Sequence, residues 1–268
     1  MRSDTNNIIC FLHNPKTGGA SLTNLIRENY TPTERYSVSN YVLKDIEHEI
    51  AGLSKERKKK IQLVSGHIEF GIHKFFQGQT VRYFTFLRDP VSRVVSHYHY
   101  AKRTPVHHLY DIIHKNNMSL EDYLSSGISL ELNNGQVRML TAQTDMNNTS
   151  VATYGSNNEA LLKLAIKNIE EHFDFIGIQE HFKESVSYIG RLYKWKHIKF
   201  PELNVNVEKK PDLSLKEIAI IEKMNMLDIQ LYQYGLKYFN EKLANNPIPI
   251  NSNRNTIGQI LHFFQKKP

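Results

Sequence analysis

Short apolar runs that alternate with helix-patterned segments limit the folds open to this chain. The apolar runs occupy residues 8–13, 61–64, 81–87 and 173–178. Segments with helical spacing follow at residues 20–29, from Pro90 onward and at residues 182–193. Strands that alternate with helices favour a parallel sheet with helices on both faces. The sequence therefore predicts an α/β fold with a central parallel β-sheet, whose ligands bind beyond the carboxyl ends of the strands.

The rest of the chain is predicted to be helical or irregular. Residues 109–171 contain several helical segments around a polar surface loop at residues 144–158. Residues 195–213 contain two prolines and are expected to be irregular. Residues 215–239 have the spacing of one long amphipathic helix. The charge run at residues 55–60 is more typical of a solvated helix face than of a binding site.

The composition excludes several classes of protein. Hydrophobic residues make up 40% and charged residues 23%, which is typical of a globular chain and not of a disordered or collagenous one. Cys10 is the single cysteine, and no Cys/His cluster has the spacing of a zinc site, so no metal is predicted. No apolar run approaches the roughly 20 residues of a membrane helix, and no secretory signal is visible. We therefore expect a cytoplasmic protein, with a lumenal domain trimmed of its anchor as the alternative.

The chain is basic. Lys and Arg number 34 against 27 Asp and Glu, which gives a formal net charge of +7. Such an excess favours an anionic ligand or partner. The basic residues are scattered, and no zinc-finger, RNP-type or helix-turn-helix signature is present, so a nucleic-acid partner is not expected. A non-catalytic protein that binds polyanions or nucleic acid stays open as an alternative.

A glycine-containing turn joins the first predicted strand to the first predicted helix. Free N–H groups and the helix dipole attract an anion at such a helix N-terminus. The turn and the first helical residues are Lys16, Thr17, Gly18, Gly19, Ala20 and Ser21. An ordinary tight turn with an exposed lysine fits this spacing equally well. The segment is not a Walker A motif, in which the lysine follows the glycines, so a nucleotide-kinase-like P-loop enzyme is only a second alternative.

A second polar segment follows the strand at residues 81–87. Arg88 stands at the end of this strand, and Ser96 lies about two turns into the next helix, so both can face the same crevice. Arg88 could bind a phosphate through two parallel hydrogen bonds. Alternatively, Arg88 pairs with Asp89 and Ser96 is a small residue in a packed helix. Taken alone, this segment favours the second interpretation.

Together, residues 13–22 and 88–96 resemble the phosphate-binding motifs of the sulfotransferases that use 3′-phosphoadenosine 5′-phosphosulfate (PAPS). The most similar branch is that of the carbohydrate sulfotransferases, which includes the heparan sulfate 2-O- and 6-O-enzymes and bacterial relatives. The likeness extends to residues 65–71, 134–140, 173–180, 203–206 and 228–232, and so spans about residues 8–240. It implies a single sulfotransferase domain over residues 1–268, with a tail at residues 245–268 that stays undetermined. It also implies a carbohydrate acceptor, which can be anionic, and no metal.

The resemblance assigns roles to the residues of these motifs. Lys16 is expected to stabilise the bridging oxygen between phosphate and sulfur. Arg88 and Ser96 are expected to hold the 3′-phosphate. The residues expected to hold the 5′-phosphate are Thr17, Gly18, Gly19, Ala20 and Ser21. The family usually has Thr where this chain has Ala20, so one hydroxyl donor is lost and weaker donor binding is expected.

The catalytic base is predicted to be His67. It follows a short strand in a Gly-His-x-x-Phe-Gly pattern that the family shares, and an ordinary histidine pKa of about 6.5 suits proton abstraction near neutral pH. A histidine that only forms local hydrogen bonds in a turn is the alternative. Glu69 is a second candidate base. The expected structural or supporting histidines are His13, His97 and His99.

Two further pairs of residues have open roles. Lys209 and Lys210 lie in a late loop that either covers the nucleotide, as a basic loop does in the relatives, or is only solvated. Gln136 and Arg138 either line the crevice or pack a helix. The sequence leaves the acceptor sugar, the sulfated position and the oligomeric state open.

Overall fold

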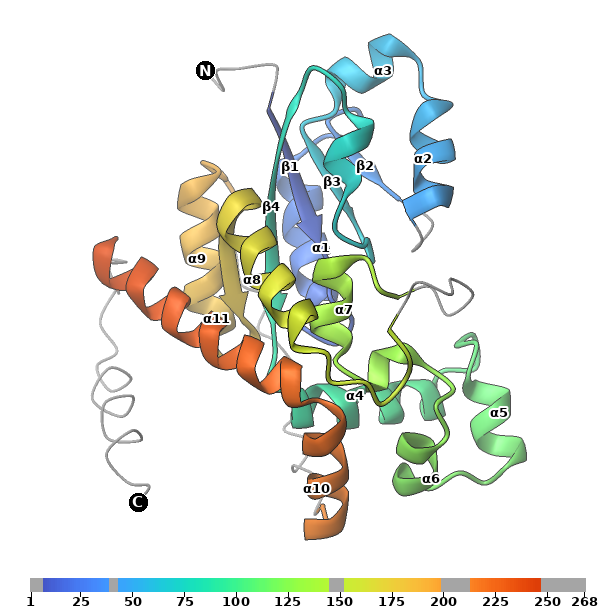
Figure 1. Cartoon of the computed structure of the whole chain (residues 1–268). Coiled ribbons are helices and arrows are strands. Elements are labelled where there is room, and N and C mark those ends of the chain that lie inside the picture. The colour runs from blue at the N-terminus through green and yellow to red at the C-terminus, as the bar shows by residue number, and fades with distance from the viewer. Residues whose placement is uncertain (1–6, 39–42, 145–151, 199–212, 247–268) are drawn as a thin grey trace.

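The computed structural model describes residues 7–38, 43–144, 152–198 and 213–246 (Figure 1). Its centre is a five-stranded sheet in which all neighbouring strands are parallel, with the order β2-β3-β1-β4-β5. The strands are β1 (Asn7–Leu12), β2 (Arg35–Ser37), β3 (Leu63–Gly66), β4 (Thr80–Leu87) and β5 (Phe173–Ile178). The predicted α/β fold with a central parallel sheet is confirmed.

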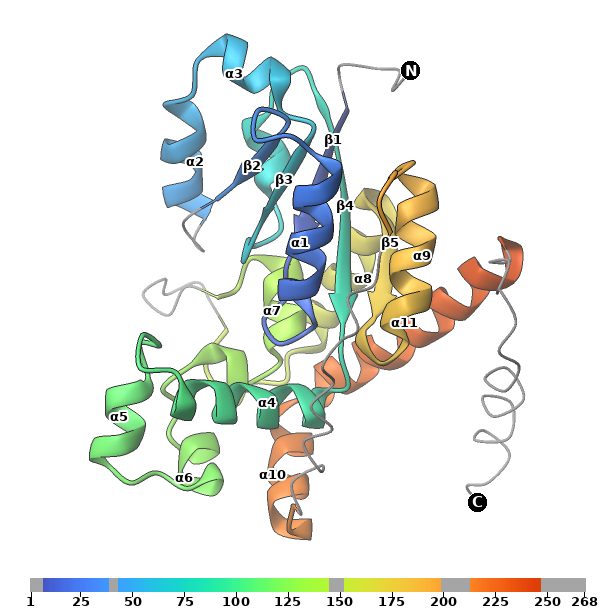
Figure 2. The same cartoon turned by 180° about the vertical axis from the view of Figure 1, so that it is seen from behind.

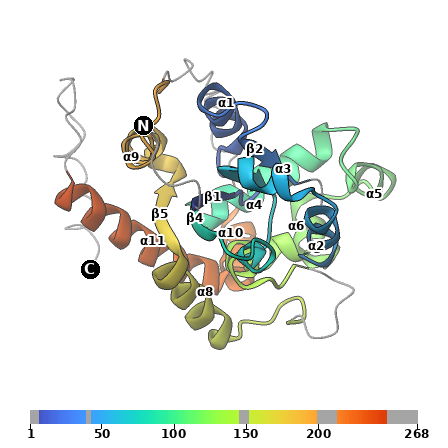
Figure 3. The ribbon, with the colours of Figure 1, turned by 90° about the horizontal axis from the view of Figure 1, so that it is seen from above.

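Helices cover both faces of this sheet. The longer ones are α1 (Gly19–Asn29), α2 (Leu43–Ala51), α4 (Pro90–Arg103), α8 (Glu159–His172), α9 (Phe182–Leu192), α10 (Leu215–Met224) and α11 (Met226–Asn245). The shorter ones are α3 (Lys55–Lys60), α5 (Tyr110–Lys115), α6 (Leu120–Ser125) and α7 (Gly135–Thr141). Helices α1 and α9 lie on one face and α8 and α11 on the other (Figures 2 and 3). Beyond the carboxyl ends of the strands lie α4, α5, α6 and α10 (Figure 1).

The register of the strands brings their carboxyl ends together. Leu12 at the end of β1 pairs with Gly66 of β3 on one side and with Thr85 of β4 on the other. Because parallel strands run in the same direction, the segments after β1, β3 and β4 all emerge at one edge of the sheet. The candidate residues after residues 12, 66 and 87 therefore share a neighbourhood, although these strand ends are 54 and 21 positions apart in the sequence.

The single helix predicted at residues 215–239 is wrong, because the chain breaks at Asn225 between α10 and α11. The amide of Asn225 is buried and donates to the carbonyls of Leu132 and Ile221, while its oxygen accepts the N–H of Asn134. A short polar side chain that bonds to backbone groups competes with the helical pattern. The amphipathic spacing continues across the break, which explains why periodicity alone did not reveal it.

Two other features concern the polar stretch at residues 31–60. The charge run forms α3, which has no buried residue, so the predicted solvated helix is confirmed. The edge strand β2 was not predicted. It has only three residues, none of them strongly apolar, and it exists because it pairs with β3, from Arg35 opposite Leu63 to Ser37 opposite Ser65.

Candidate active site

The turn after β1 exposes the N-terminus of α1. Gly18 precedes the helix with φ 86°, in the left-handed region that glycine adopts easily. Within the described residues no side chain caps this helix, and its first turn contains no acidic residue. The first N–H groups and the positive end of the helix dipole are therefore available to an anion.

Buried hydrogen bonds fix this turn on the sheet. The amide of Asn14 donates to the Thr85 hydroxyl at 3.0 Å and to the Phe86 carbonyl at 3.2 Å. The Thr17 hydroxyl donates to the Asn14 carbonyl at 2.8 Å and is buried. Thr17 thus braces the turn with its side chain, and only its backbone is left for the phosphate contact that the sequence predicted.

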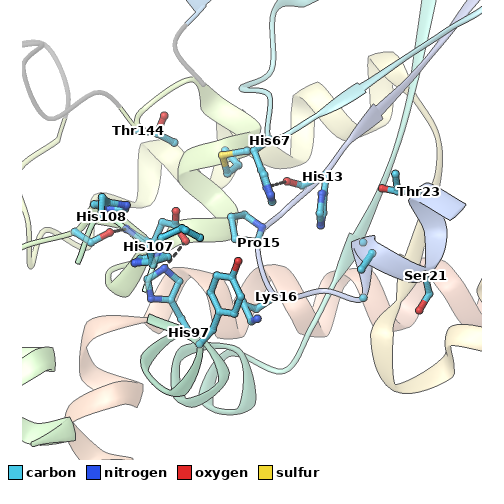
Figure 4. Close-up of a pocket in the computed structure, with 18 of the residues that line it drawn as sticks. His13, Pro15, Lys16, Ser21, Thr23, His67, His97, His107, His108 and Thr144 are labelled. Carbon is cyan, nitrogen blue, oxygen red and sulfur yellow. Dashed lines mark hydrogen bonds and ion pairs between the residues drawn. The ribbon is translucent and has the colours of Figure 1, made fainter. Parts of the chain in front are cut away.

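A cavity of about 940 Å³ lies in front of the turn (Figure 4). Five predicted site residues of the turn and the start of α1 line it, namely Lys16, Gly18, Gly19, Ala20 and Ser21. The end of β3 contributes His67, and the opposite wall contains His97 and Tyr100 of α4 together with His107 and His108. The structure therefore brings the turn and the predicted base into one cavity.

His67 is oriented by the backbone of the neighbouring strand. Its Nδ1 lies 3.0 Å from the carbonyl oxygen of His13. Because a carbonyl can only accept, Nδ1 carries the proton in this contact, and Nε2 has the lone pair of a base. Burial lowers the pKa of His67, an effect that nearby Glu131 partly opposes. The imidazole is therefore neutral near pH 7, as a general base must be.

Lys16 lies in the turn before α1, and its backbone is in the left-handed region, with φ 67°. Its Nζ is 3.9 Å from the centre of the Tyr100 ring on α4. A cation over an aromatic face is stabilised by the ring quadrupole. This contact holds the ammonium group in the cavity, on the side where the turn and α4 face each other.

Arg88 contacts the turn from the end of β4. Its Nη1 donates to the carbonyl of Lys16 at 3.0 Å. The side-chain amide of Gln136 fixes the backbone of Arg88, since Oε1 accepts the Arg88 N–H at 2.9 Å and Nε2 donates to the Arg88 carbonyl at 3.0 Å. Burial lowers the pKa of Arg88. Its buried Nε has no hydrogen-bond partner among the described residues, which is unusual for a buried donor.

Several predicted site residues, Arg88 and Thr17 among them, do not line the cavity. Ser96 is half-buried on α4 and is not among the residues that line it. Gln136 and Arg138 are buried, and Arg138 donates to the carbonyls of Asn133, Ala152 and Thr153, so both pack helix α7 and do not line the cavity.

The remaining candidates either do not line the cavity or fall outside the described residues. The second candidate base, Glu69, is buried and does not line the cavity, although it accepts the N–H of Thr144, a residue that does, at 2.8 Å. His99 lies beside Tyr98 and does not line the cavity. Lys209 and Lys210 fall outside the described residues, as do the resembling segment 203–206 and the tail from residue 247 onward.

A contact between a histidine and a carboxylate that the sequence did not reveal lies in the cavity wall. Nε2 of His97 lies 2.9 Å from Oε2 of Glu131, and Nδ1 of His97 lies 3.0 Å from the Tyr123 hydroxyl. Burial raises the pKa of Glu131, but His97 and Arg93 outweigh it and lower the pKa to about 2. Burial also lowers the pKa of His107 to about 4. No spacing links α4 to Glu131, so only the tertiary structure could show this pair.

The cavity suits an anion at the turn and a polar group between the turn and the opposite wall. In the parts of the chain that the structure describes, no cluster of three His, Cys, Asp or Glu could hold a metal ion. Over residues 7–38, 43–144, 152–198 and 213–246, no helix is both long and apolar enough to cross a membrane.

The comparisons with known proteins found sulfotransferases. A family model described as Galactose-3-O-sulfotransferase matches residues 3–247. Similar curated proteins include heparan-sulfate 6-O-sulfotransferase 3 of Mus musculus, 27% identical over 181 residues, and heparan-sulfate 6-O-sulfotransferase 1 of Homo sapiens, 28% identical over 182 residues. Each alignment covers 60% of this chain but only 38% and 44% of the two relatives, so the chain spans less than half of their length.

The search of solved structures found a sulfotransferase as well. A mouse sulfotransferase complexed with 3′-phosphoadenosine 5′-phosphate (PAP) matches with a TM-score of 0.39 and 14% sequence identity. The match covers 84% of this chain and 67% of that one.

Proposed function

The chain belongs to the galactose-3-O-sulfotransferase family, and on this premise we propose that it transfers the sulfuryl group of PAPS to a hydroxyl of a carbohydrate. The observation that carries the proposal is the shared cavity. An uncapped helix N-terminus with Lys16 faces the same space as His67, whose Nε2 is unprotonated in the tautomer that has the proton on Nδ1. The names of the relatives support a saccharide acceptor without specifying its sugar or charge.

The residues of the turn fit the donor. The N–H groups at the start of α1 suit the 5′-phosphate, because they combine free donors with the positive end of the helix dipole. Arg88 suits the 3′-phosphate, because its buried Nε lacks a partner within the described part of the chain and a guanidinium can bind phosphate through two parallel hydrogen bonds. Ala20 supplies no hydroxyl, so backbone N–H groups and the Ser21 hydroxyl make the contact with the 5′-phosphate.

The proposed reaction is an in-line displacement at sulfur. His67 Nε2 accepts the proton of the acceptor hydroxyl, and the hydroxyl oxygen forms a bond to sulfur while the bond between sulfur and the 5′-phosphate oxygen breaks. The products are a sulfate ester and PAP. Lys16 stabilises the negative charge that develops on the departing phosphate oxygen, as preorganised cations do in phosphoryl transfer. For this contact the ammonium group leaves the Tyr100 ring.

Replacing the base tests the function directly. The purified chain is incubated with PAPS labelled in the sulfuryl group and a panel of neutral and anionic oligosaccharides, and labelled saccharide is counted. We expect His67→Ala to lower turnover by about 10²-fold or more, while PAP binds with unchanged affinity. Because burial lowers the pKa of His67, the acid limb of kcat/KM should lie below the ordinary value of about 6.5.

A matched control is His99→Ala, since His99 is a half-buried histidine that does not line the cavity. It should keep wild-type turnover. Near-normal turnover of His67→Ala would refute His67 as the base, and failure of wild type to transfer the label to any saccharide would count against the carbohydrate acceptor.

A further inference from the structure

His13 occupies a position between the phosphate-binding turn and the proposed base. Its ring stacks on that of His67, with centroids 4.1 Å apart and planes at 24° (Figure 4). The His13 ring also stacks on Phe11 at 5.2 Å, and Phe11 stacks on Phe84 at 4.9 Å. The rings of Phe84, Phe11, His13 and His67 thus form a stacked series that begins in the core of the sheet and ends at His67.

The same ring rests directly on the first residue of α1. A methyl group placed on Gly19 would lie only 1.7 Å from Nε2 of His13, and the next two atoms it would meet also belong to the His13 ring. Because cores are close-packed, a shift of Gly19 must move the ring of His13. Gly19 is also one of the residues whose N–H groups begin α1. His13 is thus in contact with both the anion-binding end of the helix and His67.

The backbone of His13 adds a second connection. Its carbonyl oxygen accepts the hydrogen bond from Nδ1 of His67 at 3.0 Å, which fixes the tautomer of the base. Burial, His67 and Lys16 together lower the pKa of His13 to about 3. The ring is therefore neutral near pH 7 and is a poor proton acceptor, so it suits a spacer and not a second base.

We propose that His13 is a positioning residue that couples the phosphate-binding turn to the base, by holding its ring between Gly19 and His67. This inference rests on the proposed sulfuryl transfer. A phosphate that orders the N-terminus of α1 fixes Gly19, Gly19 fixes the ring of His13, and that ring fixes the plane in which Nε2 of His67 points. Binding of the donor then also orients the base, because Gly19, His13 and His67 are packed against one another.

Three variants test the coupling. His13→Ala removes the spacer, His13→Gln keeps a planar group of similar reach, and Gly19→Ala pushes the ring aside. We expect His13→Ala and Gly19→Ala each to lower kcat about 10-fold or more, since small misplacements of a reacting group have large kinetic effects. His13→Gln should recover most of the loss. The Kd of PAP for His13→Ala should stay within about threefold of wild type, because His13 does not contact the phosphates in the proposed function.

The double variant makes the test specific. With Ala at position 13 the added methyl group at Gly19 meets empty space, so His13→Ala/Gly19→Ala should have about the same kcat as His13→Ala alone. Two residues that act independently would instead multiply their effects, which is the standard criterion of a double-mutant cycle. A multiplicative loss, or wild-type kcat in His13→Ala, would overturn the inference.

A second measurement does not depend on turnover. Titration of His67 by NMR, with its signals assigned from a His67→Gln sample, should show a higher pKa in His13→Ala than in wild type. The stacked ring contributes to the burial that lowers the pKa of His67, and its loss admits water. An unchanged titration would contradict the coupling. Failure of the proposed function is recognised separately, as wild-type protein that neither binds PAP nor transfers the label.

Discussion

Replacing Arg88 with Ala is the most direct test of the donor site. The guanidinium donates through Nη1 to the carbonyl of Lys16, while its buried Nε has no partner in the described chain. Gln136 holds the backbone of Arg88 and not its side chain. The turn keeps the hydrogen bonds of Asn14 and Thr17 when the Arg88 side chain is removed. The variant therefore removes a phosphate ligand without removing the structure that carries it.

The magnitude follows from the hydrogen bonds at stake. A hydrogen bond to a charged group contributes about 1.5–3 kcal/mol, which corresponds to roughly 10- to 150-fold weaker binding at about 1.4 kcal/mol per factor of ten. Folding stability should change by less than about 1 kcal/mol, because the lost bond to Lys16 is offset by removal of a buried donor that has no partner. We therefore expect Arg88→Ala to weaken PAP binding by this factor with little change in melting temperature.

Calorimetric titration with PAP and with adenosine 5′-monophosphate distinguishes the phosphate that Arg88 contacts. The second ligand lacks the 3′-phosphate, so its affinity should be equal in wild type and Arg88→Ala. Arg82→Ala is the matched control. Arg82 also belongs to β4, but its partly exposed side chain pairs with Asp174 of β5 at 2.8 Å. Equal PAP affinity in wild type and Arg88→Ala would refute the assignment, and an equal loss for both ligands would place Arg88 elsewhere in the donor site.

Two stability predictions concern the carboxylates of Glu131, which lines the cavity, and of buried Asp228. The pKa of Glu131 is lowered from 4.5 to about 2, so its stabilising effect is present above about pH 4.5 and is lost as the pH falls toward 2. With 24% of its side chain exposed, we expect Glu131→Gln to lose about 2–3 kcal/mol at pH 7 in urea unfolding. A difference that does not shrink in acid would contradict this. Buried Asp228 lies 3.7 Å from buried Arg93, so Asp228→Asn should lose about 3–5 kcal/mol. Exposed Asp111→Asn is the control, and an equal effect of the two would exclude the pair as the cause.

The sequence alone was enough to predict the fold class and those parts of the site that depend on residues close together in the chain. Strand runs, helical spacing and the glycines at residues 18 and 19 are short-range patterns, and they predicted the parallel sheet, the uncapped start of α1 and the place of His67 after β3. The parallel arrangement then brought these segments to one edge, because all the strands end on the same side.

The tertiary structure alone decided which side chains meet. Glu131 reaches His97 across 34 positions, and Asp228 reaches Arg93 across 135, with no spacing that a local pattern could reveal. The break at Asn225 likewise depends on hydrogen bonds to Leu132 and Asn134, which periodicity does not register. His13 was expected from the sequence to be structural or supporting, and its place as a spacer followed only from the packing that puts its ring against both Gly19 and His67. Contacts of this kind arise from how layers pack, and packing is a property of the folded chain as a whole.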